Sequence, residues 1–209
     1  MSIDVKKDFK HLYHPPSDRF VEVEVPEFTY LSIDGHGDPN TSRDYAAAVE
    51  GLYTSGYAVR AAVKKRTGTD FVVGPLEGLW SSPDPADFVA GNKGNWDWTM
   101  LIPLPSVVLF EDTTLGLTAA AAKKGHLPIG RIRRLTLIEG LSLQIMHLGP
   151  YDDEAPVLAR LHRQVMPERG LTWNGRHHEI YLSDPRRTPA DKLKTVLRQP
   201  VVAAARSTR

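Results

Sequence analysis

The sequence contains no cysteine, and this absence excludes several kinds of chemistry at once. Without a thiol there is no disulfide, no thiolate nucleophile and no thiolate ligand for a metal ion. We therefore expect a protein of a reducing compartment, the cytoplasm, and residues 1–16 agree because they lack the apolar run of a signal peptide. Long apolar runs are also missing: Pro, Gly or charged residues interrupt each one before the roughly 20 residues that a membrane-spanning helix needs.

Neither sign of charge dominates the chain. The 26 Lys and Arg residues against 25 Asp and Glu residues give a net charge of +1 with no basic block, so we expect no direct contact with nucleic acid. The histidines show no metal-binding pattern, since the adjacent His177 and His178 point to opposite faces of a strand. No phosphate-binding loop, dinucleotide fingerprint or Gly-x-Ser-x-Gly motif is present. We expect neither a metal ion nor a cofactor.

What the chain does contain is a repeated strand motif. The segment Glu77-Gly78-Leu79-Trp80-Ser81 returns in altered form as Glu179-Ile180-Tyr181-Leu182-Ser183. Each copy is preceded first by a strand that ends in Gly with Pro or Asp, and then by an amphipathic helix. The pattern predicts an α+β fold made of two strand-helix-strand units with added strands, which would enclose a ligand cleft.

The same pattern divides the chain into segments. With 41% hydrophobic residues, its 209 residues are enough for one compact domain. Residues 1–27, rich in proline and charge, suit an extended lead-in or an edge strand better than a buried helix. The predicted segments that follow are a domain at 28–185, its repeats at about 28–105 and 130–185, a linking helix at 113–124, and a C-terminal helix (190–197) with a tail at 186–209.

Two further elements are predicted from composition. Residues 82–95, rich in Pro, Asp, Gly and Asn, read as a functional loop or lid. Apolar and polar residues alternate in 132–146, which predicts one long strand or a hairpin bent at Gly140.

Four motifs resemble the GyrI-like small-molecule-binding family, and together they cover most of the chain from Tyr30 onward. These motifs are Pro75-Leu76-Glu77-Gly78-Leu79-Trp80, Trp96-Asp97-Trp98-Thr99-Met100, Gly149-Pro150-Tyr151-Asp152 and Glu179-Ile180-Tyr181-Leu182-Ser183-Asp184-Pro185. The resemblance implies two β-α-β-β repeats related by pseudo-twofold symmetry, whose antiparallel sheet forms a central ligand groove with the helices on its other face. Some stand-alone relatives hydrolyse the strained cyclopropane of DNA-alkylating natural products, whereas regulatory relatives only bind flat, often cationic compounds. Ser81 departs from the family, which often has a second Trp at this place.

Glu179 is the first candidate for chemistry. In an extended strand it shares a face with His177 and Tyr181. A partly buried carboxylate there would attract a ligand cation or act as a general base toward water, the central role that the resemblance implies. The alternative is a surface carboxylate paired with Arg176 or a neighbouring His.

Glu77 is predicted as the counterpart of Glu179, so that two carboxylates would face one groove. The alternative is a salt bridge or a loop cap near Gly74-Pro75. Trp80 lies three residues after Glu77, and strict alternation sends the two side chains to opposite faces unless Gly78 introduces a bulge.

The remaining candidates are aromatic or apolar. Trp96, Trp98 and Met100 share one strand face and are predicted to stack on a planar ligand, although alternating aromatics also suit a core. Tyr151 follows a Gly-Pro turn, where its hydroxyl would orient water or bond a ligand oxygen, or its ring would pack at a helix start. Tyr181 is assigned a ligand-binding role beside Glu179.

Two functions follow as hypotheses. The first is a protein that binds flat aromatic or cationic small molecules and, as a detoxifying hydrolase without a cofactor, opens cyclopropane-bearing electrophiles. Glu179 and Tyr151 would be its catalytic residues. The second is a non-catalytic sensor or sequestering protein that binds the same compounds and acts through a regulatory protein partner.

Overall fold

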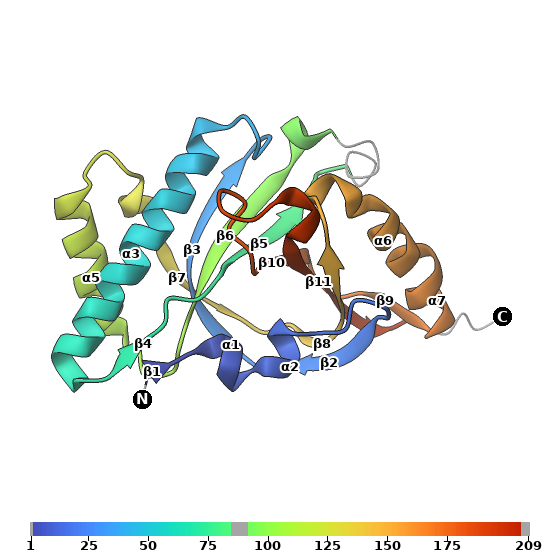
Figure 1. The fold of residues 1–209 in the computed structure, drawn as a ribbon, viewed down its shortest axis with the longest axis horizontal. Helices are drawn as coiled ribbons and strands as arrows, with labels where there is room; N and C mark the ends of the chain where they lie inside the picture. Colours follow the sequence, from blue (N-terminus) through green and yellow to red (C-terminus); the bar gives the residue numbers. More distant parts are fainter. Residues whose placement is uncertain (1, 85–91, 206–209) are drawn as a thin grey trace. The chain divides into compact units, whose positions relative to one another are not determined.

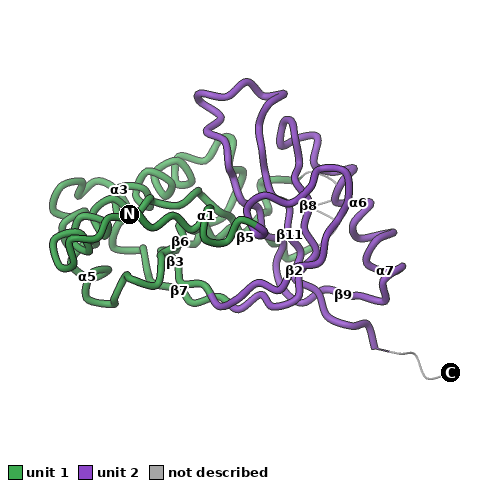
Figure 2. The backbone as a smooth tube through the Cα atoms, turned by 60° about the horizontal axis from the view of Figure 1, so that its bottom comes forward, with its two compact units in different colours: residues 1–10, 28–137 green, residues 11–27, 138–209 purple. Residues whose placement is uncertain are grey.

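The structure is a computed structural model that describes residues 2–84 and 92–205. The chain forms two compact units, drawn in different colours in Figure 2. Unit 1 comprises residues 1–10 and 28–137, and unit 2 comprises residues 11–27 and 138–209. Each unit contains an antiparallel sheet and helices (Figure 1), which confirms the predicted α+β class.

The sheet of unit 1 has the strand order β5-β6-β3-β7. Its strands are β3 (Phe28–His36), β5 (Leu76–Ser81), β6 (Asp97–Leu104) and β7 (Arg133–Leu137). The short parallel pair of β1 (Ser2–Ile3) with β4 (Asp70–Phe71) is separate from it. The remaining elements of the unit are α1 (Val5–Asp8), η1 (Lys93–Asn95) and η2 (Ile129–Arg131), together with the long helices α3 (Arg43–Thr67) and α5 (Phe110–Lys123).

Helix α3 covers one face of this sheet. Its N-terminus is capped by the Ser42 hydroxyl, which accepts a hydrogen bond of 3.1 Å from the Tyr45 N–H. Its C-terminus ends at Gly68, whose φ of +72° is a left-handed conformation that favours glycine. Gly56 lies in contact with Ile102 of β6, so the helix packs on the face that carries Trp98, Met100 and Ile102.

Helix α5 packs on α3, as Figure 1 shows. The two helices approach very closely at Gly116, because a Cβ atom there would lie 2.7 Å from the Cα of Val59. A partly buried ion pair between Arg66 and Asp112, at 2.6 Å, joins the two helices at one end. The helix predicted at 113–124 is therefore confirmed as α5, beginning three residues earlier.

The sheet of unit 2 has the strand order β2-β8-β11-β10. These strands are β2 (Val21–Val25), β8 (Gly140–Leu148), β10 (His177–Tyr181) and β11 (Lys194–Ala203), and β9 (Leu171–Trp173) pairs with the far end of β11. One continuous helical segment packs on this sheet; it consists of α6 (Ala155–Arg160), a π-helix (Leu161–Val165) and α7 (Met166–Glu168). The short elements are α2 (Lys10–Tyr13), η3 (Tyr151–Asp153) and η5 (Ala190–Lys192).

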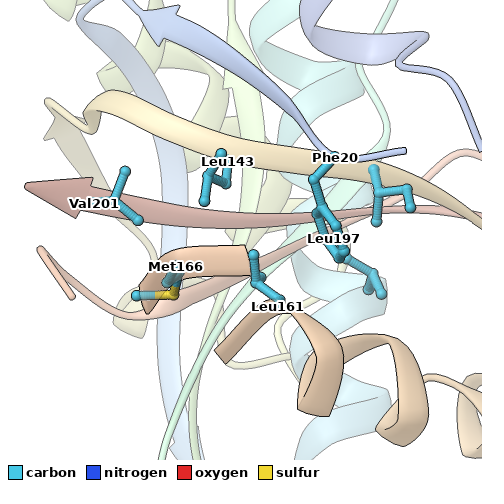
Figure 3. Packing of buried hydrophobic residues seen from close by; sticks show 7 residues of the cluster. Phe20, Leu143, Leu161, Met166, Leu197 and Val201 are labelled. Atoms are coloured by element: carbon cyan, nitrogen blue, oxygen red, sulfur yellow. The ribbon is translucent and has the colours of Figure 1, made fainter. Parts of the chain in front are cut away.

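The apolar core of unit 2 lies between this helical segment and the sheet (Figure 3). Its buried residues are Phe20, Leu143, Ile145, Leu161, Met166, Leu197 and Val201. Leu161 and Met166 come from the helical segment, and Ile145 and Leu197 are directly paired on β8 and β11. The face with Ile145 and Leu197 is therefore the one that the helices cover.

The opposite face of the unit 2 sheet carries a buried ionic network. Arg198 donates hydrogen bonds to the Glu139 carboxylate at 3.1 Å, to the Gln144 amide oxygen at 3.0 Å and to the Leu12 carbonyl at 3.0 Å. His178 Nδ1 lies 2.9 Å from the other oxygen of Glu139. Burial acts against the charge of Glu139, but His178 and Arg198 outweigh it and lower the pKa of this carboxyl from 4.5 to about 2.

Three sequence predictions differ from this fold. Residues 190–197, predicted as a C-terminal helix, contain the turn η5 and the start of β11. The spacing of Leu193, Val196 and Leu197 resembles that of a helix, but β11 pairs with β8 and β10 on its two sides and is apolar because it is buried. Residues 132–146 are not one strand or a hairpin, because β7 pairs with β3 whereas β8 pairs with β2 and β11.

The third difference concerns the lead-in. Its predicted edge strand is present as β2, but the one-turn helices α1 and α2 bury Val5, Leu12 and Tyr13. Part of the predicted loop at 82–95, residues 85–91, lies outside the described residues. The order strand, helix, strand, strand occurs in both units, as β3-α3-β5-β6 and as β8-α6-β10-β11. A duplication with twofold symmetry stays a prediction.

Candidate functional site

The predicted aromatic residues of unit 1 form one cluster. Trp80 of β5 is directly paired with Trp98 of β6, and Tyr45 from the first turn of α3 packs against both. The Tyr45 ring centroid lies 5.2 Å from that of Trp98, edge to face, and 6.3 Å from that of Trp80, nearly parallel. Trp96, just before β6, meets Trp80 edge to face at 5.6 Å. These are the distances at which aromatic pairs attract one another.

Most of this cluster is core. Trp98 is 1% exposed, Met100 is 0% exposed, and Trp80 is 4% exposed. The Trp98 ring lies directly over Gly35, where a Cβ atom would be 2.0 Å from the ring. Trp98 and Met100 therefore fill the space beneath α3 in this structure, whereas Trp96 and Tyr45 are only partly buried.

Glu77 lies on the other face of the same strand. The ladder between β5 and β6 runs without interruption from Glu77 to Ser81, so there is no bulge at Gly78. Glu77 is paired with Leu101, away from α3, whereas Gly78 and Trp80 face the helix. Glu77 and Trp80 consequently point to opposite faces, and Glu77 is 0% exposed.

Glu179 is the centre of a polar cluster in unit 2. The Tyr181 hydroxyl donates a hydrogen bond of 2.7 Å to Glu179 Oε2. His177 Nε2 lies 3.5 Å from Glu179 Oε1. The three side chains alternate along β10 on one face, as the sequence predicts, and the Glu179 side chain is 13% exposed. Glu179 is therefore not a surface carboxylate, although a neighbouring His, one of the partners that the alternative predicted, lies beside it.

Tyr151 extends this cluster from η3, at the start of the helical segment. Its ring meets the ring of Tyr181 edge to face at 5.5 Å. Burial, followed by the negative charges of Glu154 and Glu179, raises the pKa of the Tyr151 hydroxyl to about 12. The hydroxyl thus stays protonated at neutral pH and is available as a hydrogen-bond donor. The structure brings Glu179, Tyr181 and Tyr151 together.

The two glutamates differ in the face that they occupy. Glu179 is paired with Leu197, so it lies on the face that the helical segment of unit 2 covers, whereas Glu77 points away from α3. By the face occupied, Tyr181 corresponds to Trp80, and Glu179 corresponds to Gly78. The sequence echo that aligns Glu77 with Glu179 is therefore shifted by one residue, which reverses the facing of every side chain.

Two residues that contact these clusters, Tyr45 and His162, were not predicted from the sequence. Tyr45 was not singled out, although an aromatic residue one turn from a helix start is a recognisable signal. His162, which belongs to none of the sequence motifs, packs against Trp173 with ring centroids 4.1 Å apart and ring planes inclined by 41°. Burial, followed by the charge of His177, lowers the pKa of the His162 ring from 6.5 to about 4. His162 therefore lies near β10, a proximity that sequence separation conceals.

Other possible binding features were sought in residues 2–84 and 92–205. No cluster of three or more His, Cys, Asp or Glu side chains in this part of the chain has the geometry to hold a metal ion. None of its helices is long and apolar enough to cross a membrane. An open depression of about 570 Å³ lies beside β8 and α6, lined in part by His147, Val157 and Arg160, and it contains none of the predicted site residues.

Residues 18–202 match the GyrI-like small-molecule-binding domain. The chain belongs to the GyrI-like family. The matched region includes all the predicted site residues of both clusters, so the protein carries a small-molecule-binding domain. The family resemblance inferred from the four sequence motifs is confirmed.

Several solved structures of other proteins are similar to this chain. A conserved protein from Listeria innocua, described as uncharacterized, is 36% identical, with 96% of this chain and 100% of that chain covered and a TM-score of 0.87. A hydrolase from the same organism is 34% identical, with 96% and 100% of the two chains covered and a TM-score of 0.82. The C-terminal domain of EcmrR, at 14% identity and a TM-score of 0.58 over 89% and 98% of the chains, shares the fold. No curated protein matches the chain.

Proposed function

We propose that this GyrI-like protein binds flat aromatic or cationic small molecules and hydrolyses cyclopropane-bearing electrophiles, as a detoxifying enzyme that needs no cofactor. The observation that carries the proposal is the Glu179 carboxylate, 13% exposed and held by the Tyr181 hydroxyl at 2.7 Å. The description of a 34% identical relative as a hydrolase supports it.

Glu179 would act as the general base. It accepts a proton from a water molecule whose oxygen attacks a cyclopropane carbon, so that a C–O bond forms as a ring C–C bond breaks. The electron pair of the broken bond moves into the conjugated carbonyl group of the ligand, and the resulting oxygen anion is protonated to complete the addition of one water molecule. Ring strain contributes to the driving force, so positioning and proton transfer are the contributions required of the protein.

Tyrosine hydroxyls would supply hydrogen bonds in this step. Tyr181 already fixes one oxygen of Glu179, which restricts the orientation of the carboxylate. Tyr151, whose pKa is raised to about 12, can donate to the attacking water or to the oxygen of the opening product. Both residues thereby act on groups that carry charge during the reaction.

Ligand-binding roles for Glu77, Trp80, Trp96, Trp98 and Met100 are part of the proposal. Trp96 is the strongest of these candidates for stacking, because its side chain is only partly buried. Trp80, Trp98 and Met100 are almost fully buried, so their contribution would be to support the Trp96 ring through Trp80. Glu77, on the other face of β5, would attract a cationic group of the ligand.

The deciding experiment follows ring opening of a cyclopropane-bearing DNA alkylator by mass spectrometry. The protein should add water over many turnovers, and Glu179→Gln should lose about a hundred- to ten-thousand-fold in rate while keeping its fold and most of its affinity. The matched control is Glu168→Gln, an exposed glutamate of the same unit, which should react like the unmodified protein. Equal turnover in Glu179→Gln would remove this residue as the base.

A second function, a non-catalytic sensor or sequestering protein that acts through a regulatory partner, uses the same cluster. A carboxylate held next to two aromatic rings is also suited to binding an organic cation. Stoichiometric binding of the alkylator without product would favour this function, and recovery of a transcription regulator with the protein would identify the partner.

A further inference from the structure

His177 is a buried polar side chain for which the hydrolase proposal has so far no role. It is 6% exposed, and within the described part of the chain neither of its ring nitrogens makes a hydrogen bond. Such groups are rare in folded proteins because burial without a partner costs stability, and they occur frequently where function requires them. The charged group nearest its Nε2 atom is Glu179, whose Oε1 atom is 3.5 Å away.

The distance of 3.5 Å between His177 Nε2 and Glu179 Oε1 is slightly longer than a hydrogen bond. Hydrogen bonds between catalytic groups are often long in the free enzyme and shorten when the ligand binds. Glu179 Oε2 is already held by Tyr181 at 2.7 Å, so a small rotation about this anchor would bring Oε1 to His177. A carboxylate with one partner on each oxygen still has lone pairs left to accept a proton from water.

The surroundings of His177 favour Glu179 as its hydrogen-bond partner. The titratable side chains on the face that carries His177 include Glu179 and Tyr181 from β10, His147 from β8 and His162 from the π-helix, and the apolar side chains there include Ile145 and Leu197. His147 Nε2 lies 3.0 Å from the Pro150 carbonyl oxygen. Burial and the nearby His177 lower the pKa of His162 to about 4, so His162 is neutral at physiological pH. A π-helical turn is unusual and often marks a functional region. Here it carries the residue that lies close to His177.

We propose that His177 is a positioning residue for Glu179: its ring donates a hydrogen bond to Glu179 Oε1 when a ligand binds, and so holds the carboxylate in the orientation that accepts a proton from water. The proposal rests on the hydrolase function only for its kinetic consequence. The hydrogen bond itself can be observed without turnover.

The first test is therefore spectroscopic. We expect the imidazole N–H proton of His177 to become protected from exchange and to shift downfield in the NMR spectrum when proflavine, a flat aromatic cation, is added. In Glu179→Ala this signal should not appear, although the spectrum should still report proflavine binding. A proflavine-saturated protein without the signal, or an unchanged signal in Glu179→Ala, overturns the proposal.

The second test separates positioning from a merely structural role. His177→Phe keeps the ring volume and should lower kcat for the alkylator by about ten- to a hundredfold, with KM nearly unchanged, because only the orientation of the base is lost. His177→Gln, which retains a donor, should recover part of kcat. His162→Phe is the matched control and should keep kcat. Wild-type kcat in His177→Phe, or an equal loss in both Phe variants, overturns the proposal.

The two tests also distinguish this proposal from the function on which it builds. A protein that shows the NMR signal but does not open the alkylator retains the His177–Glu179 hydrogen bond and fails as a hydrolase. A protein that hydrolyses the alkylator with full dependence on Glu179, but without the signal or any effect of His177→Phe, retains the function and refutes the role of His177.

Discussion

The two units contain the same order of strands and helix, yet the helix-covered faces of their corresponding strands differ in chemistry. In unit 1, β5 presents Gly78 and Trp80 to α3, and Tyr45 closes over Trp80 and Trp98. In unit 2, β10 presents His177, Glu179 and Tyr181 to the helical segment, with Tyr151 at its start. One face is an aromatic core, and the other is a buried set of titratable groups.

The two units also differ in their ion pairs. Unit 2 encloses the ionic network of Glu139, His178 and Arg198, whereas α3 and α5 in unit 1 are joined by the smaller pair of Arg66 and Asp112. Because buried charges are stable only while they are paired, unit 2 should respond to pH and to charge removal much more strongly than unit 1.

The largest expected effect follows from removing Arg198. Arg198→Met leaves the Glu139 carboxylate buried beside His178 alone and frees the Leu12 carbonyl, and we expect it to destabilise the protein by about 3–5 kcal/mol. Chemical denaturation followed by Trp173 fluorescence, the one tryptophan of unit 2, measures this loss. Arg187→Met, at an exposed position, is the control and should change stability by less than about 0.5 kcal/mol. An equal loss of stability in Arg198→Met and Arg187→Met would contradict the role of the buried ionic network in unit 2.

The next largest effect is expected from acid, which should destabilise unit 2 more than unit 1. The pKa of Glu139 is lowered in the folded state from 4.5 to about 2, so its charged form stabilises the fold above pH 4.5. This contribution is lost progressively as the pH falls from 4.5 toward 2, where the folded state also takes up the proton. Hydrogen exchange of β11 amides should therefore accelerate over this range more than exchange of β6 amides. Equal acceleration in both strands would argue against the network as the cause.

A smaller effect is expected in unit 1. Gly35→Ala places a methyl group against the Trp98 ring, where the Cβ atom would be only 2.0 Å away, and should cost about 1–3 kcal/mol as the ring is displaced. Near-ultraviolet circular dichroism should show a disturbed tryptophan environment, and the cost should not depend on acid. Gly130→Ala, whose Cβ atom has no neighbour within 4 Å, is the control. An unchanged Tm in Gly35→Ala would show that Trp98 is not held in place by α3.

Local patterns predicted much of the fold. The amphipathic helix expected after the first strand is present as α3, a helix was expected where α5 lies, and alternation placed Glu179 and Tyr181 on one face of a strand. These features depend on neighbours in sequence, which a single chain displays directly.

What the sequence could not provide are contacts between distant segments. Nothing near Arg198 indicates that it will bind the Leu12 carbonyl, and β11 reads as a helix because burial on both faces removes the alternation that marks a strand. The facing of Glu77 depends on whether Gly78 forms a bulge, and only the ladder with β6 decides that question. His162 near His177 likewise depends on how the π-helix packs on β10.

The bond between Arg198 and Leu12 also has a consequence for synthesis of the chain. Unit 2 is built from residues 11–27 and from residues after 137, and β11 lies between β8 and β10 in its sheet. During translation the early segment emerges from the ribosome long before its partners, whereas most of unit 1 is made in between. Residues 11–27 therefore lack their partners until β8, which pairs with β2, and then β11, which supplies Arg198, have been released.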